Sequence, residues 1–271
     1  MEIAPGVHRI SEVTGSNVCL LAGEQMTLID TGIQGNGEAI VSYIKSIGRN
    51  PSDLKYILLT HFHHDHSGSA LELHELTGAQ IVTHKDEVET GPDQKPMLRK
   101  GNEADSGKAP WWVPLVMGGR RRDGLVPHTT PVHMQIDHND VIPSLGGLKI
   151  LYTPGHTPGS ISPYLEKEKV LFLGDSVLNN VDRLSRPMMY DKKRRIQLDT
   201  SLRTLRGLEA EAASFGHGPP LKGDVMTKVR ALTDKPYDLS TWRIVLKNWR
   251  TLRAFRASTK RRGHWSGSRE E

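Results

Sequence analysis

One short run of metal-binding side chains constrains this chain more than any other feature. Residues 56–59 form a continuous apolar segment typical of a buried strand, and Thr-His-Phe-His-His-Asp-His follows it at residues 60–66. Residues two apart in an extended chain face the same way, so we expect His61 and His63 to converge on one point. His64 falls in the opposite phase and is not expected to join them.

The same run provides a second pair of candidate ligands. A helix is expected over residues 67–76, and the turn into it lets Asp65 and His66 converge on a point beside the first. Imidazole and carboxylate donors suit borderline transition ions, with zinc first and iron or manganese after it. The run therefore predicts a metal site at the end of a buried strand.

Three further polar side chains repeat this placement. Each follows an apolar segment and has glycines beside it: His156 in Thr-Pro-Gly-His-Thr-Pro-Gly, Asp175 in Leu-Gly-Asp-Ser, and His217 in Phe-Gly-His-Gly-Pro. Glycine lets the backbone come close to a metal or substrate, and strand ends are where α/β sheets build sites. A histidine-rich tract alone is often a surface cluster, but four strand-end placements of one kind favour a single functional site.

Short β-rich segments alternate with helical ones along the body of the chain. Strands are expected at residues 18–21, 26–29, 56–59, 80–83, 148–152 and 170–173, and helices at 38–47, 67–76 and 198–208. The length and the composition, with 36% hydrophobic and 25% charged residues, suit a globular protein and exclude collagen-like, coiled-coil and wholly disordered chains.

The alternation breaks down between Gly91 and Pro131. Long irregular segments in a compact domain are commonly functional lids, so we expect a lid within an insertion at about residues 91–135. It carries an apolar island that starts at Trp111 and Trp112. These two side chains would either cover an acyl group of the substrate or form an oligomer contact.

The net charge of +5 is concentrated at the end of the sequence. Residues 240–271 contain nine basic and two acidic residues, which leaves 27 basic and 29 acidic residues before them. Trp242, Leu246 and Trp249 have helical spacing in this tail. We expect one domain over residues 1–236, followed by a basic amphipathic helix and a disordered tail over residues 237–271. A basic tail can bind phosphates or anionic membranes, although a solvated helix is the plainer interpretation.

Cysteine usage and hydropathy bear on the compartment. Cys19 is the only cysteine, so no internal disulfide can form, and a reducing cytoplasm is the expected location. No apolar run approaches the roughly 20 residues that cross a bilayer, so we expect no membrane span. The first residues also lack the pattern of a secretory signal.

From residue 17 to about residue 220 the chain resembles the metallo-β-lactamase-fold hydrolases. The family pattern Thr-His-x-His-x-Asp-His is matched by residues 60–66, and the later ligand positions by His156, Asp175 and His217. Leu-Ile-Asp-Thr-Gly at residues 28–32 is similar to the family's early motif, whose aspartate, here Asp30, supports the metal loop rather than binding metal. The resemblance implies an α+β fold, a four-layer αββα sandwich of two mixed β-sheets flanked by helices.

For the site, the resemblance implies two zinc ions per chain, with iron or manganese as alternatives. The first ion would be held by His61, His63 and His156, the second by Asp65, His66 and His217, and Asp175 would bridge them. A hydroxide shared between the ions would be the nucleophile, and Asp65 would also orient it or shuttle a proton. The implied enzyme is a hydrolase that cleaves an ester, lactone or thioester of a small molecule.

Differences between branches of the family narrow this activity. The antibiotic-degrading lactamases lack the bridging aspartate that is present here as Asp175. Glyoxalase II resembles the first half equally well, but its glutathione-binding basic positions are not found. The Gly-His-Gly-Pro ending at residues 216–219 is similar to acyl-homoserine-lactone lactonases and to lactamase-β-like endoribonucleases. The tyrosine that lactonases carry after the bridging aspartate is absent, because residues 176–179 are Ser-Val-Leu-Asn.

Other activities remain open at this stage. A metal-dependent nuclease or phosphodiesterase is favoured by the Gly-His-Gly-Pro ending, by the basic tail, and by Lys192 and Arg194, which would recognise an anion beside the cleft. A mononuclear iron enzyme of the persulfide-dioxygenase type ranks lowest, because it would leave the second group of ligands without a metal. Non-catalytic family members tend to lose ligands, and none is missing here. A small molecule is the expected partner, nucleic acid is less favoured, and a homodimer is compatible with the two tryptophans.

Overall fold

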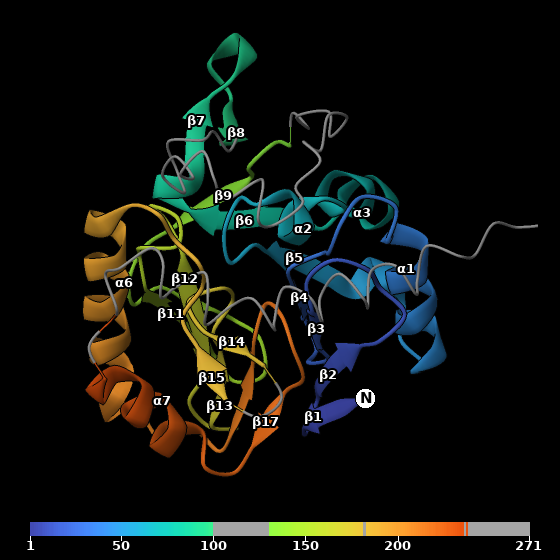
Figure 1. The fold of residues 1–271 in the computed structure, drawn as a ribbon. Helices are drawn as coiled ribbons and strands as arrows, with labels where there is room; N and C mark the ends of the chain where they lie inside the picture. The colour runs from blue at the N-terminus through green and yellow to red at the C-terminus, as the bar shows by residue number, and fades with distance from the viewer. Residues whose placement is uncertain (100–129, 181–182, 236, 238–271) are drawn as a thin grey trace, which may run out of the picture.

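The computed structural model describes residues 1–99, 130–180, 183–235 and 237. Within them, two large β-sheets lie face to face, with helices on both outer faces (Figure 1). This arrangement confirms the predicted four-layer αββα sandwich. No helix among these residues is both long and apolar enough to cross a membrane.

The first sheet combines an antiparallel and a parallel half. Among the described residues it has seven strands in the order β1-β2-β3-β4-β5-β6-β9. The strands β1 to β4 pair antiparallel, whereas β4, β5, β6 and β9 pair parallel. Their bounds are Glu2–Ala4, Val7–Ile10, Val18–Leu21, Met26–Ile29, Leu54–Leu58, Gln80–His84 and Met134–Ile136. Because β4, β5 and β6 run parallel, their carboxyl ends share one edge of the sandwich.

The second sheet is mostly antiparallel. Its six described strands follow the order β10-β11-β12-β13-β16-β17, and only β13 and β16 pair parallel. Their bounds are Val141–Ile142, Leu148–Tyr152, Ile161–Leu165, Val170–Phe172, Ala212–Ser214 and Leu221–Lys222. Two separate two-stranded antiparallel sheets are formed by β7 (Val88–Thr90) with β8 (Pro96–Leu98) and by β14 (Leu178–Asn179) with β15 (Leu184–Ser185).

Amphipathic helices cover the outer face of each sheet. The helices α1 (Gly37–Ser46) and α3 (Ala70–Thr77) flank the first sheet, and α6 (Lys192–Thr204) and α7 (Val225–Asp234) flank the second (Figure 1). A single helical turn, α2 (His64–Ser67), precedes α3. The described residues also form four short 3-10 turns: η1 (Pro51–Asp53), η2 (Lys85–Glu87), η3 (Pro92–Gln94) and η4 (Leu205–Gly207).

Three apolar clusters fill the spaces between the four layers. Ile40 and Leu73 pack with Ile57 between the first helices and the first sheet. Leu21, Leu58 and Phe172 lie between the two sheets, whereas Leu171, Leu198 and Val229 lie between the second sheet and its helices. Neighbouring residues of β13 thus face opposite clusters, as the alternation of side chains along a strand requires.

The structure corrects several predicted boundaries. The helix predicted at residues 198–208 begins at Lys192, because the Asp191 side chain accepts hydrogen bonds from the backbone N–H groups of Lys193 and Arg194 and caps the helix. A helical turn already begins at His64, before the predicted start at residue 67. Gly91 to Pro131 was expected to lack strands, yet β8 lies there. Residues 100–129 and all of the predicted 237–271 tail except Tyr237 lie outside the described residues.

The inner cluster predicts a large stability cost for loss of an aromatic side chain. Phe172 is 2% exposed between the two sheets, so Phe172→Ala is expected to lower the free energy of unfolding by about 3–5 kcal/mol. Urea unfolding followed by circular dichroism measures this loss. Ile196→Ala, at an exposed position of α6, should change stability by no more than about 0.5 kcal/mol, and equal effects of the two variants would contradict this description of the core.

Candidate metal centre

Four loops that follow strands meet at one edge of the sandwich. They follow β5 and β11, and also β13 and the strand parallel to it, β16. The loops bring together seven imidazole and carboxylate side chains from distant parts of the sequence: His61, His63, Asp65, His66, His156, Asp175 and His217. These are the seven residues that the sequence predicted to share a site.

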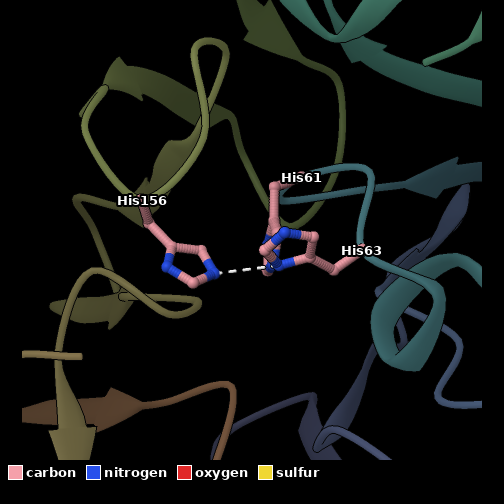
Figure 2. A group of neighbouring side chains, drawn as sticks. All are labelled: His61, His63 and His156. Atoms are coloured by element: carbon pink, nitrogen blue, oxygen red, sulfur yellow. Dashed lines mark hydrogen bonds between the residues drawn. The ribbon is translucent and has the colours of Figure 1, made fainter. Parts of the chain in front are cut away.

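The first group consists of three histidines whose ring nitrogens face one another. His63 Nδ1 lies 3.0 Å from His61 Nε2 and 3.0 Å from His156 Nε2 (Figure 2). The ring planes of His61 and His156 stand nearly perpendicular to that of His63. Three imidazoles converging in this way can hold one metal ion.

The second group lies beside the first and contains a carboxylate. Potential ligand atoms of Asp65, His66 and His217 lie within 4.8 Å of one another, and His217 Nε2 is 3.2 Å from Asp65 Oδ2. Asp175 stands between the two groups. Its oxygens lie 3.4 Å from His66 Nε2, 3.5 Å from His156 Nε2 and 3.6 Å from His217 Nε2.

Asp30 fixes the orientation of two of these histidines. The buried carboxylate accepts hydrogen bonds from the Thr60 N–H (2.8 Å), the Thr60 hydroxyl (2.8 Å) and His66 Nδ1 (2.7 Å). Because the Thr60 proton is used on Asp30, Thr60 Oγ1 is left to accept from His61 Nδ1 at 3.1 Å. We therefore assign the Nδ1–H tautomer to neutral His61 and His66, which turns both Nε2 lone pairs toward the centre of the site.

Two buried atoms in the centre fit a cation. Within the described residues, His66 Nε2 and Asp175 Oδ1 are buried without a hydrogen-bond partner, although they face each other. Leaving a buried polar atom unpaired costs about 1–3 kcal/mol. A metal ion would satisfy both atoms, and a set of imidazoles and carboxylates suits zinc, iron or manganese.

Burial and the neighbouring imidazoles keep the three histidines of the first group in their neutral form. Burial lowers the pKa of His61, and the neighbouring imidazoles lower it further. The same two causes lower the pKa of His63 to about 3, and burial lowers that of His156. These rings are therefore uncharged at neutral pH, which is the form that binds metal.

In the second group, neighbouring groups of opposite charge determine the pKa values. Burial would raise the pKa of Asp65 and Asp175, but the adjacent imidazoles outweigh it and hold both pKa values below the usual range. Burial opposes protonation of His66 and His217, but their carboxylate neighbours outweigh it and raise both pKa values. A cation that bound here would therefore compete with protonation of these two histidines.

The loop that carries His217 depends on a close approach and on two asparagines. A Cβ atom at Gly216 would lie 2.0 Å from Asp175 Oδ1, so a side chain there would displace that carboxylate. The Asn17 side chain donates to the carbonyls of Phe215 and Gly218, on either side of His217, and Asn179 donates to the carbonyl of Pro219. Neither asparagine was predicted as part of the site, because an uncharged polar residue carries no local signal of a contact with a distant part of the chain.

The structure describes two of the four predicted substrate-binding residues, and neither belongs to the candidate metal-binding groups. Trp111 and Trp112 lie outside the described residues. Lys192 is exposed and Arg194 half-buried in the first turn of α6. The helix packs against the loop of His156, since Ser201 Oγ donates to the carbonyl of Pro154. Substrate binding by these four residues stays a prediction.

Comparisons with known proteins agree with this geometry. The family model of the metallo-beta-lactamase superfamily matches residues 12–217. YflN, a probable metallo-hydrolase of Bacillus subtilis strain 168, is 29% identical over 241 residues, which cover 82% of this chain and 87% of that protein. An N-acyl homoserine lactonase of Bacillus thuringiensis is 27% identical over 145 residues, or 54% of this chain and 44% of the lactonase.

Solved structures share the architecture. A metallo-beta-lactamase family protein from Thermus thermophilus has a TM-score of 0.62 and 24% identity, with coverage of 85% of this chain and 79% of that chain. BJP-1, a subclass B3 metallo-beta-lactamase of Bradyrhizobium japonicum, has a TM-score of 0.57 and 20% identity, with coverage of 86% and 90%. At such identities the likeness establishes the fold alone.

The raised pKa values of His66 and His217 predict proton release on metal binding. Both rings must lose a proton before Nε2 can bind a cation, so zinc uptake near neutral pH should release protons, and the apparent affinity should fall as the pH is lowered. Calorimetric titrations in buffers of different ionisation enthalpy count the protons released. An affinity that stays constant between about pH 6 and pH 8 would contradict the assignment.

The contacts of Asp30 predict that its loss weakens metal binding without changing the fold. Asp30→Asn keeps the size of the side chain and tolerates the left-handed backbone (φ 59°) of this position. An amide cannot accept all the hydrogen bonds that the carboxylate accepts, so metal affinity should fall about 10–100-fold. Competition with a chelator measures the affinity, with Glu38→Gln on the exposed face of α1 as the matched substitution.

Proposed function

The chain belongs to the metallo-beta-lactamase superfamily, and from this premise we propose that it is a dinuclear metal-dependent hydrolase. Its reaction is the hydrolysis of an ester, lactone or thioester of a small molecule. The two cations are zinc in this proposal, with iron or manganese as alternatives. The observation that carries it is the pair of ligand groups with Asp175 between them.

The arrangement supports two ions rather than one. One group offers three imidazoles, and the other offers two imidazoles and the Asp65 carboxylate. Asp175 has one oxygen toward His66 and the other toward His156 and His217, so a single carboxylate can serve both groups. A mononuclear iron enzyme would use only the first group and would leave the buried atoms of the second unpaired.

The protein side chains then divide the chemistry. Two divalent cations, when bound, polarise the scissile carbonyl and make water acidic enough to attack near neutral pH. Asp65 is partly exposed and ionised, so its carboxylate can accept a hydrogen bond from the attacking water and orient it. Asp30 keeps the rings of His61 and His66 in place while charge develops at the centre.

The carboxylic substrate class is supported by the relatives and by the ligand set. One relative is an N-acyl homoserine lactonase, and another is a probable metallo-hydrolase. The bridging aspartate sets the chain apart from antibiotic-degrading lactamases, whereas the absence of a tyrosine at residues 176–179 leaves the acyl group and ring of the substrate undefined. We therefore propose the bond type and a small-molecule substrate.

Substitution of a ligand in either group should abolish turnover. His63→Ala removes a nitrogen of the first group and Asp65→Ala a carboxylate of the second, so each should reduce kcat/KM for the best ester, lactone or thioester by more than about 100-fold. Chromogenic substrates measure the rates, and metal analysis of the same samples counts the ions. Circular dichroism checks that both variants stay folded.

His8→Ala serves as the histidine control, because His8 lies on β2 and contacts Tyr43 of α1. It should retain the activity of the unaltered protein. Unchanged activity in both ligand variants would eliminate the mechanism. Preferential cleavage of phosphodiesters or single-stranded RNA, falling steeply with salt, would instead support the nuclease.

A further inference from the structure

A buried glutamate outside the ligand set lies between two of the ligand loops. Glu87 is fully buried in η2, the short turn that follows β6 of the first sheet. One side of its carboxylate faces the loop that follows β5, and the other side faces the loop that follows β11 of the second sheet. A carboxylate so deeply buried is retained only where its oxygens are well hydrogen-bonded.

On the first side, Glu87 holds the backbone between two histidines. Oε2 accepts a hydrogen bond from the Phe62 N–H at 2.7 Å. Phe62 separates His61 from His63, and its side chain is buried. The bond therefore holds the backbone segment that joins the two histidines whose nitrogens face each other.

On the second side, Glu87 holds the loop of His156. Oε1 accepts hydrogen bonds from the Thr157 hydroxyl at 2.7 Å and from the Gly159 N–H at 2.5 Å. A Cβ atom at Gly159 would lie 2.6 Å from Glu87 Cγ, so only glycine admits the carboxylate this closely. Thr157 directly follows His156, and its hydroxyl also contacts Ser160.

Asp86, the residue before Glu87, adds a second contact between η2 and the segment that carries His156. Asp86 Oδ2 accepts from the Tyr152 hydroxyl at 2.8 Å, and that hydroxyl lies 2.9 Å from the carbonyl of Pro158. The Tyr152 ring stacks on His84 with a centroid distance of 4.2 Å. The segment of residues 84–87 thus contacts both the end of β11 and the His156 loop that follows it.

We propose that Glu87 is a positioning residue that aligns the loop of His61 and His63 with the loop of His156, so that the three-histidine group exists before a cation binds. The role rests on the proposed metal-dependent function. The two loops belong to different sheets, and one carboxylate accepts N–H groups from both. Without Glu87, both loops would become ordered only when the first cation binds. The free energy of that ordering would oppose binding, so the affinity would fall.

The test is metal binding by site-directed variants. Glu87→Gln keeps the volume of the side chain, but its NH₂ group must face a backbone N–H on one side or the other. We expect the affinity for the first Co²⁺ ion to fall about 10–100-fold, with a changed absorption spectrum, and that for the second ion to change less than about threefold. Thr157→Val removes one of the three hydrogen bonds that Glu87 accepts, together with the contact to Ser160, and should give a smaller loss at the same step.

Four further variants make the result specific. His63→Ala and His217→Ala, each lacking one candidate ligand, assign the two binding steps to the two groups. Asn17→Ala releases the loop of His217, so it should weaken the second step more than the first. Glu75→Gln, at an exposed position of α3, should bind both ions like the unaltered protein.

The outcomes distinguish the positioning role of Glu87 from its absence, and from failure of the proposed function. A selective loss at the first step by Glu87→Gln and Thr157→Val, with unchanged thermal stability of the metal-free protein, supports the positioning role. Equal losses at both steps, or unaltered binding and spectrum, overturn it. If the unaltered protein binds no Co²⁺ at all, the proposed function itself fails, so the two failures are distinguishable.

Discussion

The arrangement of the candidate metal centre depends on the hydrogen bonds that the Asp30 carboxylate accepts. Asp30 directly follows β4, and its carboxylate accepts three hydrogen bonds from Thr60 and His66. Through Thr60 it also orients the ring of His61. These hydrogen bonds fix the tautomer and the ring orientation of both histidines, so that each Nε2 atom faces the centre of the site. The backbone at Asp30 is left-handed (φ 59°), a conformation that is uncommon outside glycine and is tolerated best by Asn and Asp.

Much of the fold and of the candidate site could be predicted from local patterns. A buried strand followed by alternating histidines predicts that His61 and His63 face one point, and their ring nitrogens lie 3.0 Å apart. This prediction succeeds because the signal and the structure lie within a few residues of one another. The αββα layering was predicted from a family resemblance carried by the ligand motifs, rather than from any single local pattern.

The remainder depends on contacts between distant segments, which no local pattern encodes. Asn17 reaches carbonyls about two hundred positions later, and Glu87 bonds to residues on both sheets. In the sequence each is an ordinary polar residue beside a strand. The early start of α6 was missed for a different reason: the basic residues at 192–195 were considered only as a charged, anion-binding run, whereas the cap by Asp191 makes them the first turn of a helix.

The division of the ligands between the two sheets has a consequence for biosynthesis. His61, His63, Asp65 and His66 belong to the first half of the chain, whereas His156, Asp175 and His217 belong to the second. Each group of three draws its third member from the later half. A nascent polypeptide emerging from the ribosome therefore offers only two donors of the first group until residue 156 has been added, and only two donors of the second group until residue 217 has been added. Complete sets of candidate ligands, and with them stable capture of cations, have to await synthesis of the strands of the second sheet.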